Sequence, residues 1–134
     1  MGDQQKKRVH AEFYKTEAGN EPVRNELKEL GRPIKSLVGE DLAFIEMNWR
    51  LDRPYVDLLR KAQSDADASI YEARHKIENE QYRTLFFVSD DKMVLVSFFH
   101  KKSQKTPQHE IELAYERMKK WMKAEREVKK LRRR

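Results

Sequence analysis

The loop from His100 to Pro107 concentrates groups that bind anions and move protons. These groups belong to His100, Lys101, Lys102, Ser103, Lys105 and Thr106. The loop falls between an expected strand and a long amphipathic helix. Thr106 is suited to be the N-cap of that helix and Pro107 to its first turn, so side chains and free backbone N–H groups should converge there. Such a convergence favours the binding of a phosphate group.

Two arginines are expected to face each other across a hairpin. A tight turn centred on Glu78-Asn79 would place Arg74 directly opposite Arg83. Like charges in that position destabilise a strand pair by about 0.2–1 kcal/mol, and they are usually avoided unless an anion lies between them. The alternative is that Arg74 pairs with Glu72 or Glu80 at the surface.

The arginines and the loop can contribute to one site. If the strand expected before His100 lies beside the strand that carries Arg83, the loop after His100 reaches over the face that bears Arg74 and Arg83. A solvated basic turn is the alternative for the loop lysines. His100 and His109 are candidates for general acid or base, with surface hydrogen bonding as the alternative for each. His75 should face away from Arg74 by strand alternation.

The elements that must position these groups indicate an α+β fold. Alternating apolar residues and β-branched or aromatic residues predict strands at residues 9–13, 70–76, 81–89 and 93–100. Apolar residues at helical spacing predict helices from about 21 to 30, from about 33 to 49 and from 107 to about 130. Residues 50–69 are expected to be mostly loop, anchored by Val56, Leu58 and Leu59. The order β-α-α-β-β-β-α implies a small, largely antiparallel sheet with a C-terminal helix, in a single domain over residues 1–134.

The C-terminal segment separates into an apolar part and a basic part. Residues 111–122 carry aromatic and methionine side chains at helical spacing, which favours a core stripe over an aromatic platform for nucleic acid. Residues 125–134 are strongly basic and are expected to form a frayed tail. This tail could contact an RNA backbone without sequence choice, or simply stay solvated.

Charge is distributed unevenly along the chain. Residues 1–91 carry 15 Lys/Arg against 18 Asp/Glu, a net charge of −3, whereas residues 92–134 carry 14 against 5, a net charge of +9. A concentration of positive charge at one end points to a polyanionic partner. Nucleic acid is a better candidate than an acidic membrane surface.

Several classes of site and location are made improbable by what the sequence lacks. The chain has no cysteine, and its four histidines have no metal-binding spacing, so we expect no metal and no other cofactor. No apolar stretch approaches the roughly 20 residues that span a bilayer, and the first residues do not resemble a signal peptide. We therefore expect a cytoplasmic protein with no membrane partner.

The segments at residues 82–87 and 94–107, continuing into 110–114 and Arg117-Met118, carry a sequence resemblance. They resemble the phage-derived HigB-like branch of the RelE/ParE toxins, type II toxins of toxin–antitoxin systems. Lysine-rich loops that end in Gln-Lys-Thr-Pro before an Ile-Glu-x-Ala helix are quite specific to that branch. Weaker similarity extends the resemblance over most of residues 12–123.

The resemblance implies a RelE-like fold and a ribosome-dependent mRNA endonuclease that inhibits translation. Such a toxin enters the ribosomal A site, where a deprotonated 2′-hydroxyl attacks the adjacent phosphate without a metal ion. The products are a 2′,3′-cyclic phosphate and a 5′-hydroxyl. The resemblance also implies an antitoxin with a helix-turn-helix domain encoded nearby, which would form a hetero-oligomer with a toxin that is monomeric when free.

Site residues follow from matching positions in the family pattern. Arg74 and Arg83 match the basic strand residues and would bind the scissile phosphate, with Lys102 or His100 moving protons. The RNA backbone would be held by Lys101, Ser103, Lys105 and Thr106. The segment 69–74 departs from the family pattern, and a C-terminal tyrosine found in some RelE members has no clear counterpart here.

A function of another class stays open at this point. The same fold could serve a non-enzymatic binder, such as a gyrase-directed poison of the ParE type or a phage protein that binds nucleic acid or a partner. A gyrase poison does not require Arg74 and Arg83 to converge on one phosphate. This convergence is therefore the feature that separates the two hypotheses.

Overall fold

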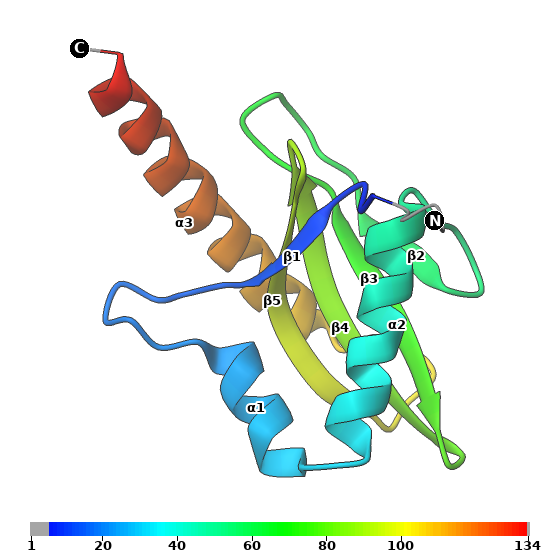
Figure 1. Ribbon diagram of the computed structural model, residues 1–134. Helices are drawn as coiled ribbons and strands as arrows, with labels where there is room; N and C mark the ends of the chain where they lie inside the picture. Colours follow the sequence, from blue (N-terminus) through cyan, green and yellow to red (C-terminus); the bar gives the residue numbers. More distant parts are fainter. Residues whose placement is uncertain (1–5, 134) are drawn as a thin grey trace, which may run out of the picture.

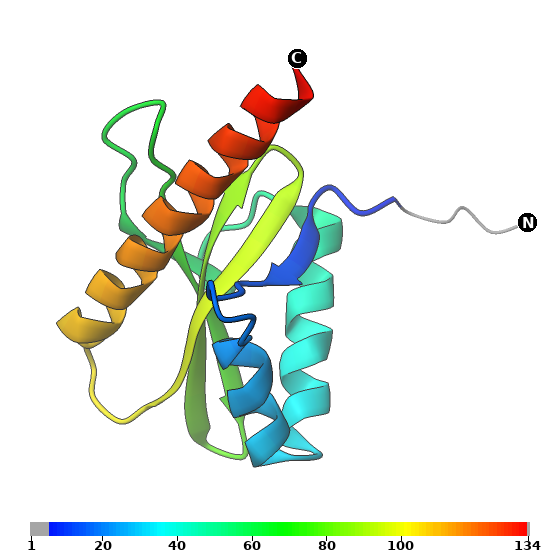
Figure 2. The ribbon, with the colours of Figure 1, turned by 90° about the vertical axis from the view of Figure 1, so that its left-hand side faces the viewer.

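A computed structural model describes residues 6–133 as a twisted five-stranded sheet with helices on both faces (Figures 1 and 2). The strands are β1 (His10–Phe13), β2 (Val56–Arg60), β3 (Ile70–Ile77), β4 (Glu80–Ser89) and β5 (Lys92–Lys101). The helices are α1 (Pro22–Leu30), α2 (Ile34–Asn48) and α3 (Gln108–Arg132). The spatial order of strands is β1-β5-β4-β3-β2, and only β1 and β5 pair in parallel. These features agree with the α+β, RelE-like fold predicted from the sequence.

The sheet separates two apolar clusters. Helices α1 and α2 cover one face, where Val38, Leu42 and Ile45 pack against side chains such as Phe86. Helix α3 crosses the other face, where Met118 packs against a second cluster of buried residues, as the two sides of the sheet in Figure 2 show. Ala114 is buried in the same cluster, and Tyr115, Trp121 and Met122 pack against it, so the predicted core stripe is confirmed from Ala114 to Met122.

Tight turns fix the register of the central strands. Glu78 and Asn79 both have positive φ, 51° and 70°, as a two-residue hairpin connection requires. Strands β3 and β4 therefore pair symmetrically about this turn. The second hairpin turns at Asp90, whose φ is 53°, and joins β4 to β5.

One strand was not predicted, and one helix end differs from its prediction. Residues 56–60, expected to be loop anchors, form β2 and pair antiparallel with β3 along the sheet edge. This strand is short and its apolar alternation is weak, because Leu58 and Leu59 are adjacent and Leu58 is exposed. Residues 6–133 thus contain five strands, one more than predicted. Helix α3 continues to Arg132, through most of the segment predicted to fray.

Helix α3 covers only part of its sheet face. The helix begins near Ser97, whose hydroxyl donates a 2.6 Å hydrogen bond to Glu110. Beyond this point the same face carries polar side chains, and the connection from β5 to α3 folds back over it (Figure 1). This uncovered end of the face is where the predicted site residues lie.

Candidate functional site

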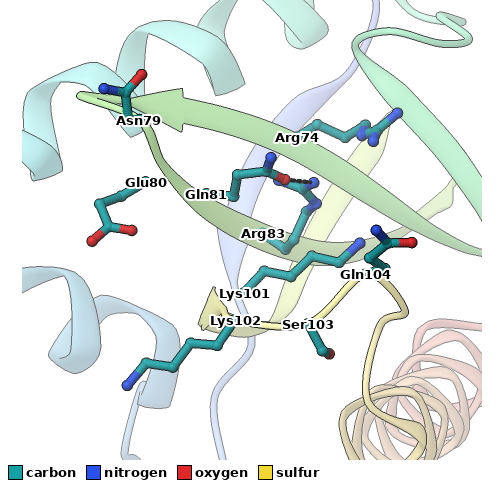
Figure 3. A pocket seen from close by; sticks show the side chains of 9 residues that line it. All are labelled: Arg74, Asn79, Glu80, Gln81, Arg83, Lys101, Lys102, Ser103 and Gln104. Carbon is teal, nitrogen blue, oxygen red and sulfur yellow. Dashed lines mark hydrogen bonds between the residues drawn. The ribbon is translucent and has the colours of Figure 1, made fainter.

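A hollow of about 520 Å³ opens on the uncovered end of the α3 face (Figure 3). Its walls come from β3, from the start of β4, from the end of β5 and from the loop after β5. The lining residues are Arg74, Asn79, Glu80, Gln81, Arg83, Lys101, Lys102, Ser103 and Gln104. Four of these carry a positive charge and only Glu80 carries a negative one. The prediction that the loop reaches the arginine-bearing face is confirmed.

The two arginines are direct cross-strand partners, as predicted. Arg74 is half-buried, whereas Arg83 is only 2% exposed. The guanidinium of Arg83 donates through Nη1 to the Tyr82 carbonyl oxygen at 2.9 Å and through Nη2 to Gln81 Oε1 at 2.5 Å. These bonds hold Arg83 in one orientation at the floor of the hollow, beside Gln81 (Figure 3).

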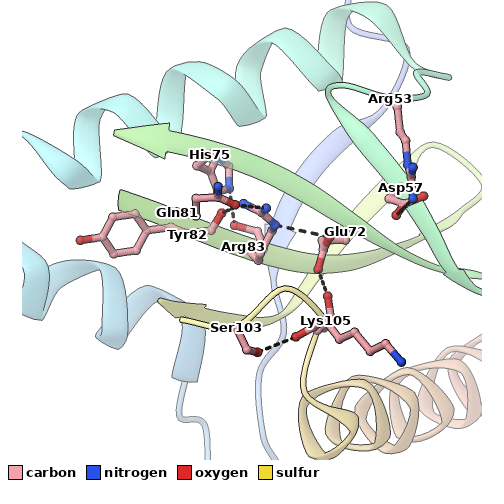
Figure 4. Close-up of polar contacts among 11 residues, drawn as sticks. Arg53, Asp57, Glu72, His75, Gln81, Tyr82, Arg83, Ser103 and Lys105 are labelled. Carbon is pink, nitrogen blue, oxygen red and sulfur yellow. Dashed lines mark hydrogen bonds and ion pairs between the residues drawn. The ribbon is translucent and has the colours of Figure 1, made fainter. Parts of the chain in front are cut away.

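Glu72 is the buried counter-charge of Arg83. Its carboxylate is 2% exposed, and Oε1 lies 3.4 Å from Arg83 Nε. Oε2 accepts a hydrogen bond from the Thr106 hydroxyl, so Glu72 links the sheet to the end of the loop (Figure 4). The surface alternative for Arg74, a pair with Glu72 or Glu80, does not appear among the ion pairs of residues 6–133.

Thr106 is not the N-cap of the last helix, which corrects the sequence prediction. Pro107 occupies that position with an extended ψ of 135°, no side chain caps the helix, and α3 begins at Gln108. The Thr106 hydroxyl instead bonds the buried carboxylate of Glu72. A buried carboxylate needs hydrogen-bond donors more than an exposed helix end does, because water can satisfy the helix end.

Positive charge in the hollow is incompletely compensated. In the described part of the chain, Arg83 Nε has no hydrogen-bond acceptor, since Glu72 is near but poorly aligned. Burial lowers the pKa of Arg83, Glu72 opposes this effect, and Arg74 adds to it. Burial also lowers the pKa of Lys101, with Glu72 again opposing and Arg83 and Arg74 contributing. A bound anion would relieve this repulsion.

Adjacent lysines of the loop point to different sides. Lys101 is paired with Gln81 in the sheet and shares the face of Arg83. Figure 3 shows the Lys101 side chain extending over Arg83 toward Gln104, whereas the Lys102 side chain extends away from the arginines. Lys101, predicted only to hold the RNA backbone, is therefore nearer to the arginines than Lys102, which was predicted to be catalytic.

The remaining loop residues lie at or beyond the rim. Ser103 lines the hollow, and its hydroxyl donates to the Lys105 carbonyl oxygen at 2.8 Å, which stabilises the loop. Lys105 is exposed and does not line the hollow; its ammonium lies on the α3 side of the loop (Figure 4). Both positions suit contacts with a chain that passes over the rim.

His100 is separated from the two arginines by the sheet. It pairs with Tyr82, stacks on that ring at 4.7 Å, and places Nε2 3.2 Å from Glu80 Oε2. It lines a different hollow beside α1. The expectation that His100 moves protons at the arginines is therefore wrong. His109 is largely exposed, with Nε2 3.6 Å from Glu110 Oε2, and does not line the hollow either.

His75 faces away from Arg74, as predicted. Its ring is fully buried against α2, with Nδ1 2.8 Å from Asp41 Oδ2 and Nε2 2.8 Å from Thr84 Oγ1. Thr84 is itself fully buried, whereas the Asp41 side chain is 47% exposed on α2. This chain of polar groups connects α2 to the sheet.

Gln81 was missed by the sequence reasoning, although a signal for it exists. Gln81 lies two residues before Arg83 and must share its face. An amide there can accept a hydrogen bond from the guanidinium.

Two further features bear on the class of site. Between residues 6 and 133, no group of three or more His, Asp or Glu side chains could hold a metal ion. Over the same residues, no helix is both long and apolar enough to cross a membrane.

Comparison with known proteins identifies one family. No curated protein matches the chain. Residues 25–119 match the family described as phage derived protein Gp49-like (DUF891), and this region includes the sheet from β2 to β5 and the whole hollow. The match covers well over half of the chain, which therefore belongs to the Gp49-like family of phage-derived proteins.

Proposed function

We propose that this protein is a HigB-like toxin that cuts mRNA on the ribosome and so inhibits translation. The observation that carries the proposal is the convergence of Arg74, Arg83 and Lys101 on one hollow with an excess of positive charge. Membership of a phage-derived family and the resemblance to HigB-like toxins support it. Under this proposal the protein acts in the cytoplasm and is held inactive by a helix-turn-helix antitoxin.

The proposed reaction is cleavage of a phosphodiester by its own 2′-hydroxyl. The 2′-oxygen gives its proton to solvent and bonds to phosphorus, while the bond to the 5′-oxygen breaks and that oxygen takes up a proton, which leaves a 2′,3′-cyclic phosphate and a 5′-hydroxyl. Negative charge accumulates on the phosphoryl oxygens during this step. Arg83 and Arg74 are placed to stabilise that charge, since Arg83 is already oriented by Gln81 and the Tyr82 carbonyl.

Lys101 is the best-placed group for proton transfer to the leaving 5′-oxygen. It shares the face of the arginines, and burial and those arginines lower its pKa, which makes its ammonium a better proton donor. Lys102, Ser103 and Lys105 are assigned to the RNA backbone on either side of the scissile phosphate. Thr106 acts indirectly, because its hydroxyl holds Glu72 beside Arg83.

Expression of Arg74→Ala tests the catalytic assignment. Arg74 is half-buried and makes no ion pair among the described residues, so its removal should leave the fold intact. Loss of one oriented cation should lower the cleavage rate by about 10²–10³-fold. Arg83→Ala should cost at least as much but leaves Glu72 unpaired, so its folding must be checked by circular dichroism. The control is Lys35→Ala, which removes an exposed lysine of α2 and should cut mRNA normally.

The readout is the chemistry of the RNA ends. Messages isolated after expression should be cut within codons and carry 5′-hydroxyl ends that accept phosphate from a kinase. Intact messages accompanied by a DNA-damage response would contradict the nuclease proposal and favour the gyrase-directed alternative. A folded Arg74→Ala variant that cuts mRNA at the normal rate would remove Arg74 from the site.

A further inference from the structure

A basic stripe follows the exposed face of the second half of α3. We define it as Lys119, Lys123, Arg126 and Lys130, which are four, three and four residues apart. All four are exposed. At 1.5 Å per residue and 3.6 residues per turn, they form one row about 16 Å long. Neighbouring like charges at this spacing destabilise a helix by about 0.2–0.5 kcal/mol per pair, and Glu127, four residues after Lys123, offsets only part of this effect.

A different side of the helix is fixed to the sheet. Glu125 lies 2.9 Å from Lys92, and Lys129 lies 3.5 Å from Asp90, so two ion pairs connect α3 to the β4–β5 hairpin. None of the four stripe residues forms an ion pair within residues 6–133. The stripe therefore stays on the solvent side of the helix. Glu125, a carboxylate of the same helix, pairs with Lys92 and not with the stripe.

The stripe forms one wall of a second hollow. A space of about 260 Å³ lies between α3 and the loop at residues 66–67, lined by Ala66, Asp67, Lys119, Lys120, Lys123 and Arg126. The loop is held there because the Tyr115 hydroxyl donates to Asp67 Oδ2 at 3.3 Å. Arg60 stacks 3.6 Å from the centre of the Tyr115 ring on the same side. The cations therefore border a concave surface.

This surface is separate from the candidate active site. The first hollow lies at the start of α3, whereas the stripe lies on its second half, which projects past the sheet (Figures 1 and 2). The two hollows have no lining residue in common.

We propose that the basic stripe binds the phosphodiester backbone of a folded RNA at a second place on the protein. Cations one helical turn apart along a concave wall suit a row of phosphates, and such contacts carry no base specificity. A membrane surface fits less well, because an interfacial helix needs a free apolar face. Here Met118 and Trp121 pack toward the sheet, and only Val128 and Leu131 are exposed.

The test measures RNA binding by the full-length chain as a function of salt. A fluorescent RNA hairpin is titrated with the wild type and with the triple variant Lys123→Gln/Arg126→Gln/Lys130→Gln, all at exposed positions. Removal of three phosphate contacts should reduce the slope of log K against log salt by about 2–3, since each contact contributes about 0.7–0.9. At a salt concentration of about 0.1 M, affinity should fall by at least tenfold.

A matched control removes the same charge elsewhere. The variant Lys28→Gln/Arg32→Gln/Lys35→Gln changes three exposed cations near α1 and α2 and should lower affinity less than threefold. An equal loss in this control would overturn the proposal, because net charge alone would account for binding. A DNA hairpin of the same sequence shows whether a phosphate backbone without the 2′-hydroxyl is enough for binding. If the stripe variant binds both hairpins more weakly, or the RNA hairpin alone, the result supports the proposal.

Two further measurements distinguish RNA binding at the stripe from membrane binding and from catalysis. If the stripe variant loses binding to vesicles with an anionic lipid but keeps its affinity for RNA, the partner is a membrane and the proposal is wrong. The variant Arg74→Ala removes at most one phosphate contact, in the other hollow, so it should reduce the salt slope by less than about 1 even when cleavage is lost. The test of RNA binding at the stripe is therefore independent of the test of the proposed nuclease activity.

Discussion

Replacement of Glu72 by glutamine should destabilise the protein and at the same time strengthen anion binding. Glu72 and Arg83 are each only 2% exposed, and Glu72 Oε1 lies 3.4 Å from Arg83 Nε. Glutamine keeps an oxygen that can accept the Thr106 hydrogen bond, so the change removes charge while preserving shape. The buried guanidinium would then face Arg74 and Lys101 without its counter-ion.

The magnitude follows from the distance. At 3.4 Å and an effective dielectric constant of 20, the attraction between two unit charges is about 5 kcal/mol. Glutamine avoids the desolvation cost of a buried carboxylate, which offsets part of this lost attraction. Removal of one partner of a buried ion pair generally costs about 3–5 kcal/mol. We expect a loss of about 3 kcal/mol in the free energy of unfolding. For a chain of 134 residues, this lowers Tm by on the order of 10 °C.

The assay is urea unfolding with and without inorganic phosphate. A ligand that binds only the native state stabilises it by RT ln(1 + [L]/Kd), about 2.7 kcal/mol at a hundredfold excess over Kd. Phosphate should take the place of the missing carboxylate beside Arg83. It should therefore restore more stability to Glu72→Gln than it adds to the wild type.

The matched control is Glu80→Gln at the rim of the same hollow. Glu80 is largely exposed, so this change should alter stability by less than about 0.5 kcal/mol. The reasoning is refuted if Glu72→Gln unfolds at the same urea concentration as the wild type. It is also refuted if phosphate stabilises both proteins equally, because the loss of the Glu72 charge would then not have changed the charge available to an anion.

Further predictions concern the lysines, the histidine of the loop and an acid on β2. In an mRNA cleavage assay, Lys101→Met should lower the rate at least tenfold more than Lys102→Met, since only Lys101 shares the face of the arginines. His100→Ala should cut at the normal rate, and a loss in a folded variant would contradict its placement across the sheet. Asp57 has a pKa below its usual 3.8, chiefly because of the hydrogen bond from Arg53. The ionised Asp57 should therefore stabilise the folded protein fully above about pH 4, and this stabilisation should disappear as the pH falls below that value. In urea unfolding, Asp57→Asn should lack this pH-dependent part of the stability.

The cross-strand arginine pair could be predicted from the sequence because it depends on local geometry. A two-residue turn at Glu78-Asn79 determines the register of the hairpin, and the positive φ values confirm it. The same reasoning placed His75 on the other face. Strand β2 could not be predicted in this way, since Val56–Arg60 becomes a strand only by pairing with β3.

The role of Thr106 depends on a contact distant in sequence. Its position before Pro107 favours an N-cap, but the carboxylate that it bonds belongs to Glu72, on another strand. Local preference is worth about 1 kcal/mol. Satisfying a buried carboxylate is worth more, so the tertiary contact prevails.

A register shift decides which loop residue faces the arginines. Counting outward from the Asp90-Asp91 turn would pair Gln81 with His100 and put His100 on the face of Arg83. The structure instead pairs Gln81 with Lys101, because the register shifts by one residue between Leu85 and Phe86. A shift of one residue exchanges the two faces of a strand.

The cause of the shift is an extra residue in β5. Leu85 pairs with Ser97 and Phe86 with Leu95, so Val96 has no partner on β4. Its carbonyl oxygen accepts a 2.7 Å hydrogen bond from Arg117 Nη1, which satisfies a group that a regular ladder would have paired. Helix α3 thereby stabilises the bulge, and the bulge turns a lysine rather than a histidine toward the hollow. The chemistry available beside the arginines is therefore set by a backbone irregularity that residue spacing alone does not reveal.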